Sequence, residues 1–430
     1  MKPIVVVLLD GLGDRAYPQL GGRSSNEAAH TPNLDRLCAG GSCGLLTALG
    51  PGRAPSSELA HWAMLGYRPD EFPGRAVLEG RGAGMAVSPD RVYAFAALRP
   101  AERRGGELWL TGRPRRGDAR DEADAAALLA ACAGLEARGL RFTLAGLGAG
   151  EAILELTGDA DDRVTDSDAF FRDRHPLLRP RACAPAADRT ACAAEAWTRL
   201  VLETLREHPV NRSRCADRLP TLDAITLKWW GRPRPAPSFL ERHGLRGTIV
   251  GGSRFITGLA ATLGLHAVER AETGDPRADL RLRLAVVEER LAAGDDFAFV
   301  HLKALDEAGH TKDPHARLRT IESLDAALDR PPVERAILCV TGDHCTPASR
   351  EVIHSGDPVP LVLAGPGVAR DRVERFGELD CAAGLLGRLQ GPDLMPVLLN
   401  AADRPLFLGS RPTPFAHADG HPALYEPLML

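Results

Sequence analysis

Short, wholly apolar runs constrain the fold of this chain more than any other feature. The first, at residues 4–9, contains only isoleucine, valine and leucine, and Asp10 follows it at once. Runs of this kind, with no polar face, are typical of strands buried on both sides of a parallel sheet. Comparable strands are expected at 297–300, 336–340 and 359–363, with helices at 278–293 and 316–328. This alternation of strands and helices predicts a doubly wound, mostly parallel α/β sheet.

The middle of the chain lacks this alternation. Residues 99–120 are rich in Arg and Gly and only weakly periodic, and two strands are expected at 142–147 and 152–157. A chain of 430 residues is long enough for two or three domains. The domains that we expect are a discontinuous core of residues 1–91 and 246–430 and a smaller inserted α/β domain of residues 92–245.

The composition argues against several classes of protein. The chain has 53 Lys and Arg against 57 Asp and Glu, so it lacks the basic surplus of a general nucleic-acid-binding protein. No run of 18 uncharged apolar residues occurs, and the opening run is too short for a signal peptide, so we expect no membrane span. The nine cysteines contain no Cys-x-x-Cys pair and are expected to be reduced thiols. These features favour a cytoplasmic protein.

Acidic and histidine side chains follow three of the expected strands. Asp10 follows the first, Asp306 and His310 follow the second, and Asp343 and His344 follow the third. In an open parallel sheet, ligand sites form beyond the carboxyl ends of the strands. A spacing of four also puts the first Asp–His pair on one helical face. Each piece alone has another explanation, either an aspartate that caps a helix or a solvated helix start.

Together with His354, these residues supply three carboxylates and three imidazoles, enough for two metal ions. Oxygen and imidazole ligands without thiolate suit Mn²⁺ or Zn²⁺, with Mg²⁺ as a further choice. Two divalent ions about 4 Å apart are a common device for phosphoryl transfer. The sequence therefore predicts a dimetal centre for that chemistry.

Ser57 is the candidate nucleophile. Pro55 and Ser56 indicate the entry to a helix, so Ser57 is expected near a helix N-terminus, which attracts phosphate oxygens. A serine must lose its proton to attack, and coordination to a metal promotes that loss. Alternatively, Ser56 or Ser57 only caps the helix, with Glu58 complementing the helix dipole.

Taken together, these motifs resemble the cofactor-independent phosphoglycerate mutases of the archaeal type, within the alkaline phosphatase superfamily. The resemblance extends over both ends of the chain in the same order. The matching segments are 10–15, 27–35, 57–61, 74–75 with 78–79, 306–310, 341–347 and 354–360.

The resemblance implies an alkaline-phosphatase-like core with an inserted cap, and an isomerase that interconverts 3- and 2-phosphoglycerate in glycolysis. By the same resemblance, one metal ion is held by Asp306, His310 and His354. The other is held by Asp10, Asp343 and His344, with the oxygen of Ser57 as a further ligand. Ser57 would become phosphoserine and return the phosphate to a neighbouring hydroxyl of the same substrate molecule.

The inserted domain departs from the family pattern. The family's cap supplies arginines that hold the substrate, and at 110–118 the arginines persist but a leading Asp is absent. At 148–152 an expected Arg and His are missing, and Glu151 stands nearby, whereas 230–239 keeps the family's Trp-Gly…Pro…Phe spacing. The candidate substrate-binding residues are Arg113, Arg115, Arg116, Arg232 and Arg234.

These departures spare the candidate metal ligands and affect the substrate clamp. The alternative to a mutase is therefore a metal-dependent phosphohydrolase or phosphotransferase acting on another small phosphorylated or phosphonate acid. A catalytically silent relative is disfavoured because the nucleophile and all six candidate ligands are retained.

Overall fold

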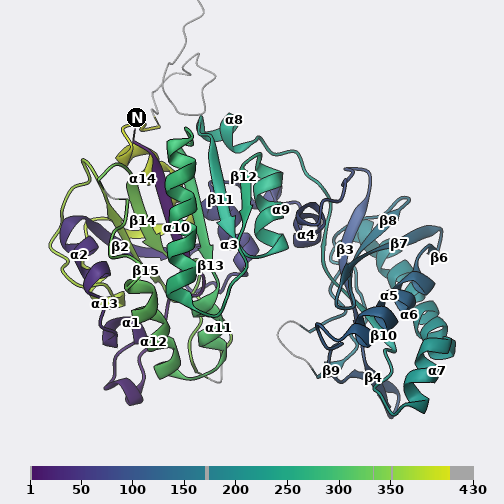
Figure 1. Ribbon diagram of the computed structural model, residues 1–430. Coiled ribbons are helices and arrows are strands. Elements are labelled where there is room, and N and C mark those ends of the chain that lie inside the picture. The colour runs from purple at the N-terminus through teal and green to yellow at the C-terminus, as the bar shows by residue number, and fades with distance from the viewer. Residues whose placement is uncertain (1, 170–173, 333, 350–351, 407–430) are drawn as a thin grey trace, which may run out of the picture. The chain divides into compact units, whose positions relative to one another are not determined.

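The structure, a computed structural model, describes residues 2–169, 174–332, 334–349 and 352–406. The chain forms two compact units (Figure 1). Unit 1 is made of Met1–Phe72 and Ala236–Leu430, and unit 2 is the intervening Pro73–Pro235.

Unit 1 is built on an eight-stranded sheet. Seven of its strands run in one direction and β15 runs against its two neighbours, β14 and β2. This confirms the predicted doubly wound, mostly parallel α/β fold. In spatial order the strands are β12 (His266–Glu269), β11 (Gly247–Gly251), β13 (Phe297–Leu302), β1 (Ile4–Leu9), β14 (Ile337–Thr341), β15 (Val359–Ala364), β2 (Ser42–Thr47) and β16 (Gly387–Gln390).

The reversed direction of β15 has a physical reason in the connection that precedes it. A parallel neighbour needs a crossover, usually a helix, to bring the chain back to the starting edge. No helix lies among the described residues between β14 and β15. The chain therefore re-enters the sheet from the edge where β14 ends.

Helices cover both faces of this sheet, and in Figure 1 the long helix α10 lies across the front of it. On one face Val5 and Val300 pack in the same core as Leu284 of α10. On the other face the ring of Phe297 lies 4.7 Å from that of Phe239 in α8. The helices of unit 1 are α1 (Ser25–Ala28), α2 (Pro32–Gly40), α3 (Ser57–Met64), α8 (Phe239–His243), α9 (Arg254–Leu263), α10 (Pro276–Ala292), α11 (Ala304–His310), α12 (Pro314–Asp325), α13 (Glu378–Cys381) and α14 (Gly391–Ala401), with 3-10 turns at Pro18–Leu20 and Pro69–Glu71.

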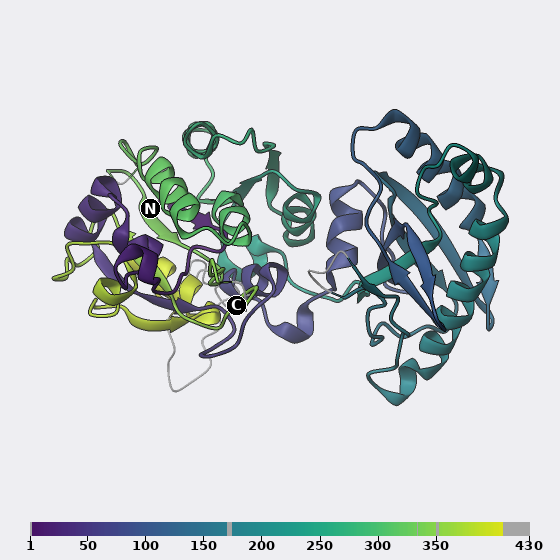
Figure 2. The same ribbon diagram turned by 90° about the horizontal axis from the view of Figure 1, so that it is seen from below.

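Unit 2 contains a five-stranded antiparallel sheet with α5 and α6 on one face and α4 on the other (Figure 2). Both strands expected on either side of the Gly-rich turn are present, as β7 and β8. A hairpin, β4–β5, with the short strand β9, occupies part of the weakly periodic Arg-rich region. The strands are β10 (Ala224–Gly231), β3 (Val92–Arg99), β8 (Glu151–Thr157), β7 (Leu140–Gly148), β6 (Leu135–Ala137), β4 (Ala101–Arg104), β5 (Glu107–Leu110) and β9 (His175–Pro176). The helices are α4 (Arg75–Gly82), α5 (Ala119–Cys132), α6 (Asp188–Glu207) and α7 (Pro209–Ala216), with a 3-10 turn at Pro185–Ala187.

The division into units differs from the expected boundaries at 91/92 and 245/246. Helix α4 joins unit 2 because Val77 packs in a small core with Tyr93 and Phe95 of β3. Helix α8 joins unit 1 because Phe239 packs on the sheet there. Both ends of the inserted segment thus come earlier in the chain than the sequence pattern indicated.

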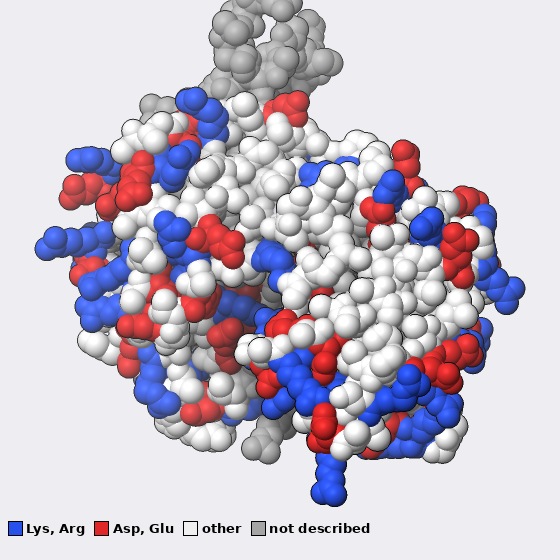
Figure 3. All heavy atoms as spheres, turned by 45° about the vertical axis from the view of Figure 1, so that its right-hand side comes forward, with Lys and Arg blue, Asp and Glu red and all other residues white. Residues whose placement is uncertain are grey.

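The surface agrees with the near-neutral composition. Basic and acidic side chains are interspersed over the face drawn in Figure 3. Among the helices that the structure describes, none is long and apolar enough to cross a membrane. All nine cysteines are free thiols.

Candidate functional site

The candidate metal ligands meet at one edge of the unit 1 sheet. Strands β13, β1 and β14 are neighbours in the sheet and run parallel. Their carboxyl ends lead directly into Asp10, the helix α11 with Asp306 and His310, and the loop with Asp343 and His344. Residues more than 290 positions apart in the chain are thereby brought within hydrogen-bonding distance.

One group of potential ligands consists of Asp10, Asp343 and His344. One ligand atom from each lies within 4.8 Å of the other two, and all three side chains are buried. The Oγ of Ser57, the first residue of α3, lies 3.1 Å from Nε2 of His344. Ser56 occupies the cap position of α3 and makes no side-chain capping bond, so capping does not account for this pair of serines.

A second group consists of Asp306, His344 and His354, whose ligand atoms also lie within 4.8 Å of one another. Nε2 of His310 is 3.2 Å from Oδ1 of Asp306, and Nε2 of His354 is 3.3 Å from the same oxygen. The two groups share His344, so the six candidate ligands form one continuous cluster.

The charges in this cluster favour a cation. Burial raises the pKa of Asp10, but hydrogen bonds with His301 and His344 outweigh burial and hold it well below its usual range. Burial lowers the pKa of His344, but the charges of Asp343, Asp10 and Asp306 raise it to about 9. The three carboxylates thus stay ionised and draw positive charge to the place where they converge.

Thr346 determines which nitrogen of His344 faces the cluster. Its hydroxyl donates to Oδ1 of Asp306 at 2.8 Å, which uses the only proton on that oxygen. Nδ1 of His344, 3.0 Å away, must then donate to the Thr346 oxygen. Nε2 is left to face Asp10, Asp343 and Ser57. Contacts of this kind orient histidine ligands in metal sites.

The residues present fit a metal ion. Buried polar atoms in proteins are normally hydrogen-bonded. Oδ1 of Asp10 and Oδ2 of Asp343 are buried, yet they accept no hydrogen bond from any described residue. Each is a carboxylate oxygen that points at the shared imidazole of His344. Two such oxygens beside imidazole nitrogens form a suitable donor set for a divalent ion.

Two further histidines belong to this site although the sequence argument did not select them. Nε2 of His61 lies 3.2 Å from Oδ2 of Asp343, and Nε2 of His301 lies 3.0 Å from Oδ2 of Asp10. Both had a detectable signal. His61 follows Ser57 by one helical turn, and His301 is the only polar side chain in the otherwise apolar strand β13.

A separate cavity of about 210 Å³ lies in unit 2. Four basic side chains line it against two acidic ones, namely Arg99, Arg113, Arg116 and Lys228 against Glu151 and Asp168. Nη1 of Arg99 donates to Asp168 at 3.0 Å, and burial lowers the pKa of the neighbouring Lys228. A basic cavity of this size suits a small anion.

The structure separates the five predicted substrate-binding arginines. Arg113 and Arg116 line the cavity, although Arg116 also pairs with Glu151 at 2.6 Å. The other three are not among the lining residues. Arg115 pairs with Asp118 and Asp121, Arg232 donates to the carbonyl oxygen of Ala160, and Arg234 pairs with Asp162. Arg99 and Lys228 line the cavity but were not predicted, because nothing in the sequence marks them as neighbours of Arg113.

Two other features lie apart from this chemistry. A larger hollow of about 1090 Å³ lies at the opposite edge of the unit 1 sheet, beside Pro3 and Ala336, which precede β1 and β14. None of its described lining residues is a candidate ligand. Cys38, Cys43 and Cys381 also come within 4.8 Å of one another, but they are fully buried in the apolar core. We therefore place the chemistry at the Asp–His cluster.

Comparisons with known proteins agree with this placement. Residues 2–401 match the model of the metalloenzyme superfamily. The chain is 36% identical to the 2,3-bisphosphoglycerate-independent phosphoglycerate mutase of Methanopyrus kandleri, over 94% of this chain and 97% of that protein. It is 34% identical to the protein of the same name from Methanoculleus marisnigri, over 94% and 98%.

Two solved structures are similar along nearly the whole chain. The PH0037 protein from Pyrococcus horikoshii superposes with a TM-score of 0.76 and 26% identity, covering 95% of this chain and 99% of that one. The cofactor-independent phosphoglycerate mutase from Thermoplasma acidophilum gives a TM-score of 0.64 and 29% identity, covering 94% and 100%.

Proposed function

Because this chain belongs to the metalloenzyme superfamily, and within it to the 2,3-bisphosphoglycerate-independent phosphoglycerate mutases of the archaeal type, we propose that it interconverts 3- and 2-phosphoglycerate. The proposal includes two divalent ions at the Asp–His cluster and Ser57 as the transient carrier of the phosphoryl group.

One observation carries the proposal: a serine hydroxyl at the edge of a buried Asp–His cluster. Ser57 is partly exposed, whereas Asp10, Asp343 and His344 behind it are buried. A substrate phosphate can therefore reach the hydroxyl from solvent. The charged groups that would activate the hydroxyl lie on its protected side.

In this proposal Asp306, His310 and His354 hold one ion, and Asp10, Asp343 and His344 hold the other with Ser57. We expect Mn²⁺ or Zn²⁺, with Mg²⁺ as a further choice. When bound, such ions lower the pKa of a coordinated hydroxyl and neutralise charge on the transferring phosphoryl group.

The chain's own groups account for the proposed transfer. The Ser57 oxygen attacks the phosphorus atom, the bond from phosphorus to the substrate oxygen breaks, and the departing hydroxyl takes up a proton. The neighbouring hydroxyl of the same glycerate then attacks the phosphoserine and releases Ser57. Nε2 of His344, oriented by Thr346, lies close enough to exchange the Ser57 proton.

The unit 2 cavity is the proposed site for the anionic groups of the substrate. Arg113 and Arg116 supply guanidinium groups, which bind carboxylate or phosphate through two parallel hydrogen bonds. Glu151 favours the second candidate function, transfer or hydrolysis on another small phosphorylated or phosphonate acid. Its pairing with Arg116 reduces the positive charge available for phosphoglycerate.

The test uses purified protein and 3-phosphoglycerate, with Mn²⁺ added or removed by chelation. 2-Phosphoglycerate and free phosphate are followed separately. The proposal predicts metal-dependent formation of 2-phosphoglycerate with little phosphate released. Release of phosphate without isomerisation would favour the second candidate, and isomerisation by metal-free protein would contradict the proposed metal centre.

A further inference from the structure

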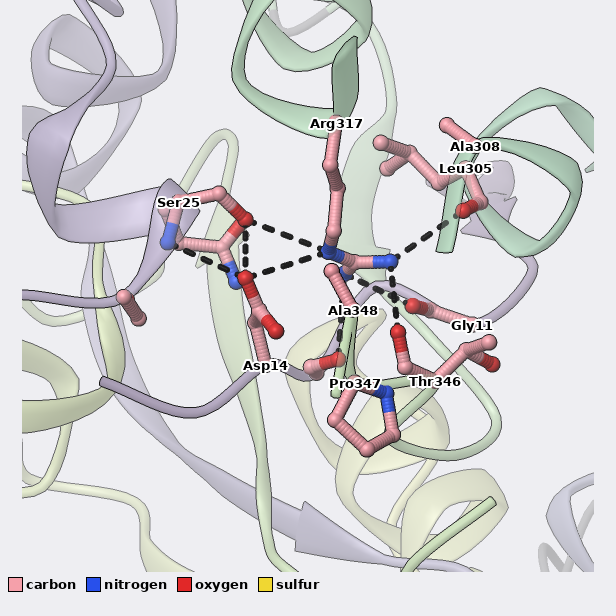
Figure 4. A network of polar contacts seen from close by, with 12 residues as sticks. Gly11, Asp14, Ser25, Leu305, Ala308, Arg317, Thr346, Pro347 and Ala348 are labelled. Atoms are coloured by element: carbon pink, nitrogen blue, oxygen red, sulfur yellow. Dashed lines mark hydrogen bonds and ion pairs between the residues drawn. The ribbon is translucent and has the colours of Figure 1, made fainter. Parts of the chain in front are cut away.

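Arg317 lies beneath the Asp–His cluster and belongs to none of its candidate ligands. It sits in the first turn of α12 and is fully buried, with 0% of its surface exposed. Figure 4 shows its side chain reaching into the space between three segments of the chain. A fully buried guanidinium needs acceptors for all five of its N–H groups.

The acceptors of Arg317 come from all three segments. Two of its nitrogens donate to five backbone carbonyl oxygens, and the third contacts a carboxylate and a hydroxyl. The distances are 2.8, 2.5 and 3.0 Å from Nη2 to the oxygens of Gly11, Leu12 and Gly13, 3.1 Å from Nη1 to those of Leu305 and Thr346, and 3.1 and 3.3 Å from Nε to Oγ of Ser25 and Oδ2 of Asp14.

These carbonyl groups are next to the candidate ligands in the chain. Gly11 follows Asp10, Leu305 precedes Asp306, and Thr346 is two residues after His344. A ligand cannot shift far when the adjoining peptide group is held. Both candidate metal groups are therefore anchored by one side chain.

The charge of Arg317 is balanced inside the fold. Asp14, whose side chain is 0% exposed, is its carboxylate partner. Asp14 also accepts hydrogen bonds from the Tyr17 hydroxyl at 2.6 Å and from the backbone nitrogen of Ser25 at 3.1 Å. The pair thus keeps its orientation, and the planar guanidinium presents its donors in a fixed fork that lysine cannot reproduce.

We infer that Arg317 is a positioning residue of the dimetal centre, which aligns the ligand segments of both ions at once. The inference rests on the proposed function, because that proposal makes the Asp–His cluster a metal site. It predicts that removing the Arg317 fork weakens both ions together, whereas removing one ligand affects mainly the ion that this ligand holds.

The test compares Arg317→Met and Arg317→Lys with the parent protein and with Arg283→Met. Arg283 is a matched control because it is also 0% exposed, but it contacts the carbonyl oxygen of Arg270 and lies 3.6 Å from Glu272 instead. Folding is checked by circular dichroism. Binding of Mn²⁺ is measured by competition with a chelator, and binding of Co²⁺ by its visible absorption spectrum, without substrate.

For folded Arg317→Met we expect both ions to bind about 10- to 100-fold more weakly, which is the usual effect of losing a group that orients metal ligands. The Co²⁺ spectrum should change as well. Arg317→Lys keeps the charge and should recover only part of the affinity. Arg283→Met should unfold at a lower temperature while binding both ions like the parent.

Parent-like affinity and an unchanged Co²⁺ spectrum in Arg317→Met would overturn the inference. If that variant does not fold, Arg317→Lys decides by the same two readouts. A parent protein that binds two ions but does not isomerise phosphoglycerate would refute the proposed function alone. A parent that binds no ion would refute both.

Discussion

The hydroxyl oxygen of Ser57 lies 3.1 Å from Nε2 of His344. These residues are 287 positions apart in the chain, and their contact joins the N-terminus of α3 to the loop after β14. Because Nδ1 of His344 is engaged by Thr346, Nε2 is the nitrogen available to the serine. The contact therefore links the proposed nucleophile to the proposed metal ligands.

Thr346→Val should weaken metal binding and turnover about 10- to 100-fold, since the valine cannot orient His344 and Asp306. Thr341→Val is the control, because Thr341 is equally buried and bonds to the carbonyl oxygen of Pro360 instead. Chelator competition and initial rates measure the two effects. Equal behaviour of the two variants would show that the Thr346 hydroxyl does not orient the site.

His354→Ala should lower turnover by orders of magnitude and leave one ion per chain instead of two, because it opens the coordination shell of one ion. Metal content of the dialysed protein and initial rates provide the measurement. The control is His315→Ala, since His315 is exposed at the start of α12. Two tightly bound ions in His354→Ala would contradict the ligand assignment.

Arg113→Lys should reduce turnover about tenfold or more and raise the ratio of free phosphate to 2-phosphoglycerate, because lysine cannot bind an anion through two parallel bonds. Arg115→Lys is the matched control, since Arg115 pairs with Asp118 and Asp121 away from the cavity. Metal content should be unchanged in both. If all five Arg→Lys variants at positions 113, 115, 116, 232 and 234 behave like the parent, these arginines do not form the clamp.

Glu378→Gln should change how stability depends on pH. Burial raises the pKa of Glu378 from 4.5 to about 7, so the folded state keeps a proton that the unfolded chain has lost. That contribution to stability is full below pH 4.5 and declines as the pH rises through 7. Removing the carboxyl should flatten this decline and raise the melting temperature at pH 8 relative to the parent. The exposed Glu374→Gln is the control, and parallel melting curves for all three proteins would refute the assignment.

Much of the fold was predictable because the buried strands carry a strong pattern. The first strand is apolar on both faces, and the residues expected at 142–147 and 152–157 form β7 and β8. The direction of β15 was not predictable from its own residues, since it depends on the connection before it. The inserted unit began earlier than expected because Val77 packs against Tyr93, a contact that composition does not reveal.

The site was predictable where side-chain chemistry coincides with strand ends. Asp10, Asp306 and Asp343 follow three parallel strands, and the structure brings them together with His344. Arg317 was not predictable, because it lies in an ordinary helical pattern and acts through backbone carbonyls far away in the chain. The same holds for Arg99 and Lys228, which reach the unit 2 cavity from β3 and β10.

The most direct test of the account is to trap the phosphorylated enzyme during turnover. Protein with Mn²⁺ is mixed with 3-phosphoglycerate, quenched in acid within the first turnovers, digested, and mapped by mass spectrometry. The account predicts phosphate on Ser57, present in the parent and in Ser56→Ala and absent after chelation or in Ser57→Ala, which should be inactive. Phosphate on another residue, or full isomerisation by Ser57→Ala, would contradict it.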